Sequence, residues 1–116
     1  MASVEVDPTS FRVNLGRLER LGALHGDLEA TRAQVAGAQA VDDLWEQLRG
    51  IRAPGTGIPR TIMLGTTRKD GAKDFCVVYG KAPGLLVELR DHEFARVLVS
   101  MALDDAVRYA KELSQT

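Results

Sequence analysis

Four short apolar runs between residues 61 and 100 dominate the hydrophobic pattern of the chain. They are rich in β-branched, aromatic and large aliphatic residues, and Gly, Pro, Asp or Lys residues bound them. In the third run Leu85, Val87 and Leu89 alternate with polar positions, which is typical of a sheet covered on one side. We therefore predict four strands, at residues 61–64, 74–79, 85–90 and 94–100.

The connections between these runs are short and rich in turn residues. They leave no room for crossover helices, so we predict sequential antiparallel pairing. Lys69-Asp70-Gly71-Ala72 predicts a hairpin loop in which Gly71 takes a positive backbone angle. The run at 74–79 is apolar at consecutive positions, which predicts a central strand or one overlain by a helix on its second side. We also expect Val87 and Val97 to be buried on one face.

Residues 7–50 carry apolar positions at helical spacing. Asp7 and Pro8 are typical of a helix start, since Asp caps the first turn and Pro fits its first position. Gly22 and Gly26 interrupt the pattern, and a second helix is predicted from Asp27 to about residue 50. We predict a helical hairpin, and one bent helix is the alternative that the two glycines leave open. The apolar stripe comprises Phe11, Leu15, Leu18, Leu28, Val35, Trp45 and Leu48.

Two further segments complete the predicted organisation of one α+β domain. Residues 51–60 are rich in Gly and Pro and predict a linker. Residues 103–113 show helical spacing, with Asp104 and Asp105 in the first turn and Lys111 in the last, as the helix dipole favours. The expected fold is an N-terminal helical hairpin over 7–50, then an antiparallel sheet of about four strands over 61–116 with a C-terminal helix packed on it.

The block from residue 53 to about residue 111 resembles a known type of domain. The resemblance rests on Ala-Pro-Gly-Thr at 53–56, Leu64-Gly65-Thr66, Asp74-Phe75, and the runs at 85–89 and 94–99. This arrangement is similar to uncharacterised bacterial domains of pleckstrin-homology-like type. The resemblance implies a small sheet closed by a C-terminal helix, and it implies no known chemistry. Cys76 stands where many of those relatives have an aromatic residue.

Composition narrows the classes of function. Of the 116 residues 45% are hydrophobic, which is enough for a packed core, and the net charge of −1 disfavours a nucleic-acid binder. A single cysteine cannot form an internal disulfide, and no apolar run approaches the ~20 residues that span a bilayer. The first residues are too polar for a secretory leader. We expect a cytoplasmic protein without a transmembrane segment.

Cys76 and His92 are the only candidates for covalent or acid–base chemistry that the sequence suggests. With Asp91 they would form a nucleophile, a base and an orienting carboxylate. A cysteine between Phe75 and Val77 in a strand is more commonly a small buried hydrophobe, and we expect slow thiol labelling in the native state. The chain has two His and one Cys, and no pair at zinc spacing, so we expect no metal and no cofactor. A small enzyme using Cys76 or His92 remains an alternative to a non-enzymatic protein.

Basic residues lie near the ends and turns of the predicted sheet. They would form a rim that binds an anion or a lipid headgroup, although solvated loop charge is the commoner explanation. The Gly-rich loop before them is followed by Pro59 and a strand, unlike a P-loop, which has Lys and a helix there. The candidate anion-binding residues are Arg60, Arg68, Lys69, Lys73 and Lys81.

The function that we expect from the sequence is a small protein-interaction module that associates with itself. A helix from Asp27 to residue 50 would extend roughly 35 Å, farther than strands of ~20 Å cover. The excess apolar surface would mark an interface, so we predict a two-fold homodimer joined through the N-terminal helices. The protein partner beyond that is unknown. The predicted interface residues are Phe11, Leu15, Leu18, Leu28 and Val35.

Overall fold

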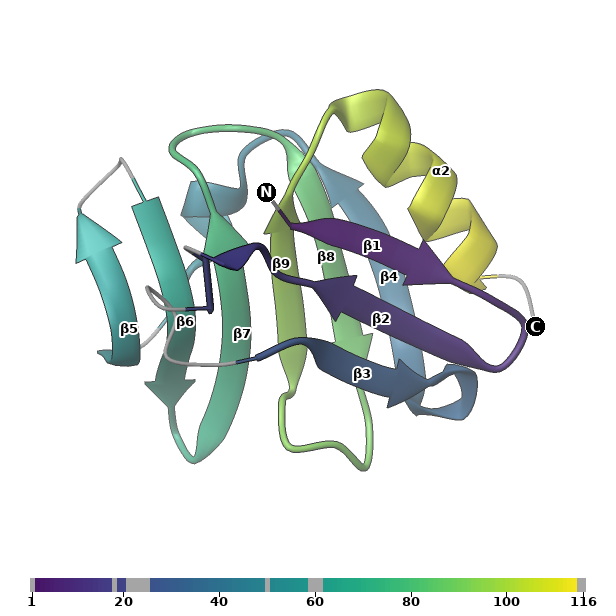
Figure 1. Cartoon of the computed structure of the whole chain (residues 1–116), viewed down its shortest axis with the longest axis horizontal. Helices are drawn as coiled ribbons and strands as arrows, with labels where there is room; N and C mark the ends of the chain where they lie inside the picture. Colours follow the sequence, from purple (N-terminus) through teal and green to yellow (C-terminus); the bar gives the residue numbers. More distant parts are fainter. Residues whose placement is uncertain (1, 18, 21–25, 50, 59–61, 115–116) are drawn as a thin grey trace.

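The structure, a computed structural model, describes residues 2–17, 19–20, 26–49, 51–58 and 62–114. It is mostly β, with a three-stranded sheet lying across a six-stranded sheet and a C-terminal helix beside the small sheet (Figure 1). The small sheet consists of β1 (Ser3–Val6), β2 (Ser10–Asn14) and β3 (Leu28–Thr31). The large sheet consists of β4 (Val35–Val41), β5 (Ile51–Ile58), β6 (Ile62–Lys69), β7 (Ala72–Val78), β8 (Gly84–Leu89) and β9 (Arg96–Ser100). The remaining elements are the 3-10 helices η1 (Arg32–Gln34) and η2 (Leu44–Gln47) and the helix α2 (Leu103–Ser114).

The predicted N-terminal helical hairpin is wrong, because strands occupy most of residues 3–41. In β2 the buried Phe11 and Val13 alternate with polar neighbours, which is the period of a strand. Asp7 does not cap a helix: its carboxylate accepts hydrogen bonds from the backbone of Thr9 and Ser10 and so closes the β1–β2 turn. Arg17, Glu19 and Arg20 are helical, but the chain returns to β-structure at β3.

The predicted second helix and the predicted linker are also corrected. The segment that was expected to be the second helix forms β3, η1, β4 and η2 instead. β4 has the sequence VAGAQAV, whose β-branched ends suit a strand paired along β8. Residues 51–58 form β5, which pairs with β6 and carries a register shift between Arg52 and Gly55. Four predicted strands appear as β6 to β9, although their order is not sequential.

The large sheet has the order β4-β8-β9-β7-β6-β5. β9 lies between β7 and β8, parallel to β7 and antiparallel to β8, so the prediction of sequential antiparallel pairing is wrong at this point. Val97, Leu98 and Val99 are buried at consecutive positions, which suits β9 to an interior place with both faces covered. β7 is interior as well, as its sequence predicts. β4 and β5 are left as the two edges.

The β6–β7 hairpin forms as predicted. Asp70 and Gly71 have φ angles of 52° and 83°, and positive angles at both central residues are characteristic of the tight hairpin turn that matches strand twist. Asp is among the few residues with a side chain that visit this region.

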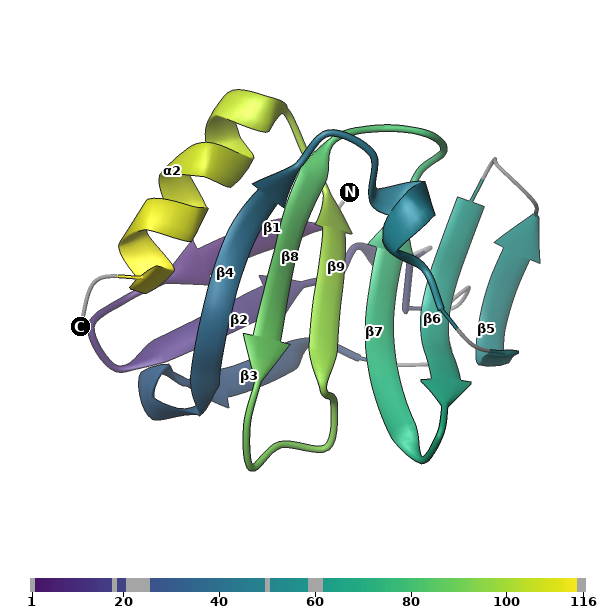
Figure 2. The same cartoon turned by 180° about the vertical axis from the view of Figure 1, so that it is seen from behind.

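The core has two parts, one on each face of the large sheet. Between the sheets, Phe11, Phe75, Val87 and Val97 are fully buried, and Val87 pairs directly with Val97, which confirms that both valines lie in the core. On the far face η2 lies over the large sheet, as the view from behind shows (Figure 2), and a smaller cluster is buried there. This second cluster comprises Leu44, Met63, Cys76, Val78, Leu86 and Leu98.

Gly84 allows η2 to approach the sheet closely. A Cβ atom there would lie 2.3 Å from Leu44 Cδ1 and 2.3 Å from the carbonyl oxygen of Val99. Leu44 is itself fully buried, so neither neighbour has room to move. Glycine is therefore required at the first residue of β8.

Helix α2 forms as predicted and packs over β4 and β8. Ala106 and Leu113 are buried against the core, whereas Leu103 and Val107 are each 40% exposed. The predicted apolar face of α2 is thus only partly covered, and the uncovered part lies beside the edge strand β4.

Candidate functional site

Cys76 and His92 do not come together. Cys76 is fully buried on the η2 side of the large sheet, and burial raises the pKa of its thiol to about 12. His92 lies on the other side, where its Nδ1 accepts the Phe94 N–H at 3.0 Å. Its Nε2 must then donate to the Glu29 carbonyl oxygen, 2.9 Å away. Each group has a structural role, and neither positions the other for catalysis.

The basic residues do not form one rim. Arg68, Lys69 and Lys73 lie at the β6–β7 hairpin, and Lys81 lies beyond the opposite end of β7. Lys73 Nζ is 3.0 Å from Glu93 Oε1, and Lys81 Nζ is 3.9 Å from Asp43 Oδ2, so acidic side chains accompany both. Arg60 lies outside the described residues. The described geometry shows no convergent anion site among these side chains.

The predicted interface residues lie mainly inside the protein. Phe11, Leu15 and Leu28 are buried in the core between the sheets, and Val35 packs half-buried against it. Leu18 lies outside the described residues. The helical stripe from which the homodimer was predicted is therefore absent, and three of its residues stabilise the chain's own fold.

A buried ionic cluster around Asp74 was not predicted. Asp74 Oδ2 lies 2.8 Å from Arg49 Nε and 2.7 Å from Arg96 Nη2, and Arg96 Nη2 also donates to the Gln47 carbonyl oxygen at 2.7 Å. The three charged residues come from three separate segments, so no local spacing indicates the cluster. The carboxylate of Asp74 accepts hydrogen bonds from both arginines. The cluster is therefore a structural clamp that joins the chain after η2 to the β7–β9 pair.

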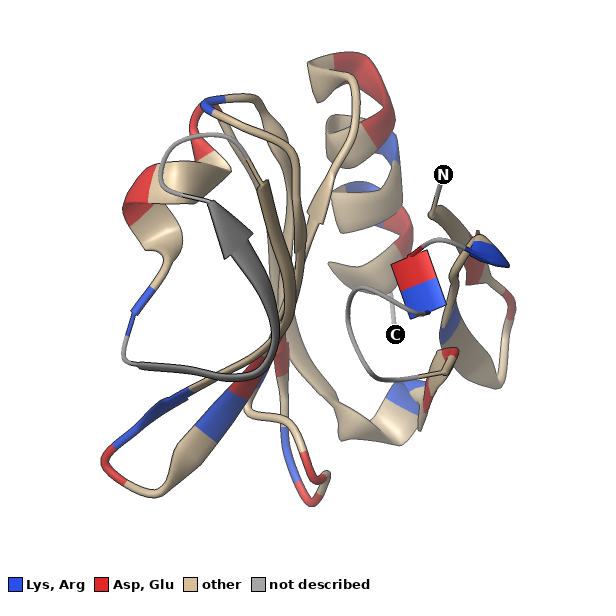
Figure 3. Ribbon diagram, turned by 60° about the vertical axis from the view of Figure 1, so that its left-hand side comes forward, with Lys and Arg blue, Asp and Glu red and all other residues tan. Residues whose placement is uncertain are grey.

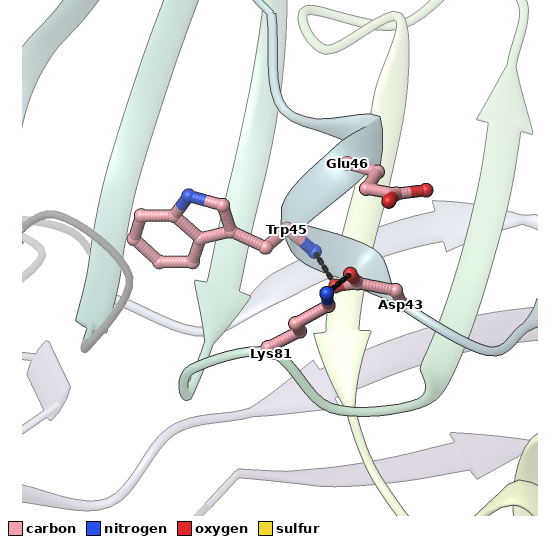
Figure 4. A pocket seen from close by; sticks show the side chains of 4 residues that line it. All are labelled: Asp43, Trp45, Glu46 and Lys81. Atoms are coloured by element: carbon pink, nitrogen blue, oxygen red, sulfur yellow. Dashed lines mark hydrogen bonds and ion pairs between the residues drawn. The ribbon is translucent and has the colours of Figure 1, made fainter.

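A small pocket of about 140 Å³ lies beside η2 and is lined by Asp43, Trp45, Glu46 and Lys81. Asp43 Oδ1 accepts the Trp45 backbone N–H at 3.0 Å and so caps η2. Figure 4 shows the Trp45 ring and the Glu46 carboxylate pointing in different directions. Asp43 and Lys81 point toward each other in the same view, with Lys81 Nζ 3.9 Å from Asp43 Oδ2, so these two polar groups of the small pocket pair with one another.

Among the described residues, no group of three or more His, Cys, Asp or Glu side chains is arranged to hold a metal ion. In the same part of the chain, no helix is long and apolar enough to cross a membrane.

The edge of the large sheet at β4 is the surface best suited to bind another molecule. Among the strands that the structure describes, β4 pairs only with β8, and its sequence contains neither a charge nor a proline. Natural proteins commonly protect such edges with charged residues, prolines or bulges. The opposite edge strand β5 differs in sequence, because it contains a charge and a proline, Arg52 and Pro54, whereas a register shift occurs in both edge strands. Ladder pairing on β4 is regular from Gly37 to Val41, after an irregularity next to Val35.

A shallow groove of about 270 Å³ runs between β4 and α2. We call it the edge groove; its lining residues are Ala38, Ala40, Val107, Ala110, Lys111 and Ser114. The small alanines of β4 and the exposed Val107 leave apolar surface next to a strand edge. A second hollow of about 220 Å³ lies along the same strand and includes Gln39 and Leu86. The strand edge and the two hollows together can hold an extended peptide. Its backbone would form hydrogen bonds along β4, and every second side chain of the peptide would enter the groove.

Comparison with protein-family models, with curated proteins and with solved structures finds no significant match to this chain. The likeness to pleckstrin-homology-like domains therefore stays a prediction from the sequence.

Proposed function

We propose that this protein is a non-enzymatic interaction module that binds an extended segment of a partner protein as an added strand along β4. The observation that carries the proposal is the open, uncharged edge of β4 beside the edge groove. Main-chain hydrogen bonds along such an edge supply affinity, and pockets for alternate side chains supply specificity.

A second copy of the chain is a poor occupant of this edge. α2 packs over β4 in each copy, and two paired β4 strands would lie about 4.8 Å apart. Packed helices need about 8–10 Å between their axes, so pairing β4 with a second β4 would crowd the two copies of α2. A lone extended segment brings no second helix to this edge. The homodimer stays a prediction from the sequence, as does a cytoplasmic location, and the module proposed here acts on a different protein.

The test uses the full chain as bait for a displayed library of random peptides, each about ten residues long, which is ample to span an edge strand. We expect selected peptides to bind in one orientation along β4. In a peptide strand paired to an edge, every second backbone N–H donates a hydrogen bond to that edge. Methylating the nitrogens of these N–H groups should therefore abolish binding, whereas methylating the nitrogens in between should leave the affinity unchanged. Failure to select any peptide, or equal tolerance of both methylated sets, would overturn the proposal.

A further inference from the structure

The two ends of the edge groove differ in charge. At the carboxyl end of β4, Asp42 is exposed and directly follows the strand. The first turn of α2 adds Asp104 and Asp105, both exposed, and the red band at the start of the helix in Figure 3 marks this turn. Asp105 is 3.1 Å from Arg108, and Lys81 lies within 4 Å of Asp43, but Asp42 and Asp104 give this end an acidic excess.

The fold brings these acidic residues together from distant parts of the sequence. Val41 pairs with Gly84, and Gly84 pairs with Ser100, so the carboxyl ends of β4 and β9 lie at the same end of the sheet, with β8 between them. The Met101 N–H then bonds to the Pro83 carbonyl oxygen at 3.2 Å, and α2 begins two residues later. Both cartoon views show the start of α2 near the arrowhead of β4 (Figures 1 and 2).

The other end of the groove carries both signs. Arg32 Nη2 donates to the Glu112 carbonyl oxygen at 2.7 Å, which places the last turn of α2 near the start of β4. Lys111 and Arg90 are exposed there, and so are Glu88 and Asp91. A charged residue of a bound peptide would therefore meet both positive and negative side chains at the amino end of β4, but an excess of negative side chains at its carboxyl end. Only the acidic end can distinguish a positively charged peptide from a negatively charged one.

We infer that the edge groove selects an extended peptide that runs antiparallel to β4 and carries Lys or Arg on its amino-terminal side. This inference rests on the proposed function, and it names the chemistry of the partner. An antiparallel strand places its amino end at the carboxyl end of β4, beside Asp42 and Asp104. Antiparallel pairing is also slightly more stable for each residue than parallel pairing. The apolar groove then accepts small or β-branched side chains at alternate positions in the middle of the peptide.

The test compares four versions of one peptide from the displayed library. The residue just before the paired stretch is Ala, Lys or Glu, and a fourth version carries Lys after the stretch instead. We expect the amino-terminal Lys version to bind about three- to tenfold more tightly than the Ala version, and the Glu version to bind more weakly. The preference should shrink as salt is raised, because exposed charges are screened.

Matched variants of the protein locate the effect. In the double variant Asp42→Asn with Asp104→Asn, the ratio of Lys to Ala peptide affinity should fall close to one. Asp70→Asn removes one charge by the same substitution at the distant β6–β7 hairpin, and Asn tolerates the positive φ there, so this control should keep the full ratio.

Each outcome separates the inference from the proposed function. If the Ala peptide binds along β4 but the Ala, Lys and Glu versions bind with equal affinity, the inference about charge is wrong and the strand-binding function stands. Preference for Lys after the stretch would contradict the antiparallel orientation. An unchanged ratio in the Asp42→Asn, Asp104→Asn variant would contradict the assigned residues, and failure of every version to bind would overturn the function itself.

Discussion

Glu19 and Tyr79 form a hydrogen bond that joins the N-terminal region to the end of β7. The Tyr79 hydroxyl donates to Glu19 Oε2, and the Gly16 N–H donates to Glu19 Oε1 at 2.8 Å. Burial alone raises the pKa of the Glu19 carboxyl, but the hydrogen bonds from Tyr79 and Gly16 outweigh it and hold that pKa below its usual value. Burial and the bond to Glu19 both raise the pKa of Tyr79. The pair is therefore most stable with Glu19 ionised and Tyr79 protonated.

This pair makes folding stability depend on pH. Because the pKa of Glu19 is lower in the folded than in the unfolded chain, its contribution is complete above the unfolded value of about 4.3 and is lost as the pH falls through the folded value. Glu19→Gln should cost about 1 kcal/mol near pH 7, and the difference from the parent should shrink below about pH 4. Urea unfolding of both proteins across this range measures it. A difference that does not change with pH would contradict the assigned ionisation, and Glu5→Gln at an exposed site is the control.

Single residues also show where sequence reasoning reaches its limit. The prediction that Cys76 is a buried hydrophobe agrees with its place under η2, because its apolar neighbours in sequence already indicate burial. Asp7 was misassigned because an Asp before Pro can close a tight turn as well as cap a helix. Here its carboxylate closes the β1–β2 turn, and these hydrogen bonds lower its pKa to about 2.

At the scale of elements, the ionic cluster joins three segments that pack at one end of β7. Asp74 is 1% exposed, and the Arg96 side chain is 14% exposed. Asp74→Ala should lower the free energy of unfolding by about 3 kcal/mol, because it leaves the Arg96 charge buried without its partner. Arg49 is more exposed, so Arg49→Ala should cost about 1 kcal/mol or less. Urea unfolding measures both.

The ion pair of Lys73 and Glu93, which is more exposed than Asp74 and Arg96, supplies the control for this prediction. Lys73→Ala removes this neighbouring pair and the contact of the ammonium with the Phe94 ring, and it should change stability by about 1 kcal/mol or less. If Asp74→Ala and Lys73→Ala lower the free energy of unfolding by the same small amount, the Asp74 cluster does not act as a clamp.

The elements differ in how far their sequences specify them. The strands β6 to β9 and the helix α2 are predictable because each combines a clear period with turn or capping residues at its ends. Residues 11–48 are not, because Phe11, Leu15, Leu28 and Val35 also satisfy helical spacing. The alternation of Phe11 with Val13 is the local signal that favours a strand, and it spans only one short segment. The consecutive apolar residues Val97, Leu98 and Val99 suit β9 to an interior place, but no local pattern specifies that its neighbours are β7 and β8.

At the scale of the whole molecule, the edge groove could not be found from the sequence. Its two walls, β4 and α2, are separated by about half the chain, and β4 was expected to be helix. The low charge of VAGAQAV indicates an unprotected edge only once the strand order places β4 at the margin of the sheet. The acidic end of the groove depends on the same topology, since it joins Asp42 to the first turn of α2.

The central claim is that β4 accepts a strand, and amide hydrogen exchange of the protein with and without a saturating selected peptide tests it most directly. Within Gly37–Val41, every second amide already bonds to β8, and the others face the open edge. We predict that the edge-facing amides slow by about tenfold or more when the peptide is bound, with β5 unchanged. Unaltered exchange along β4 under saturating peptide, or new protection confined to another element, would contradict the account.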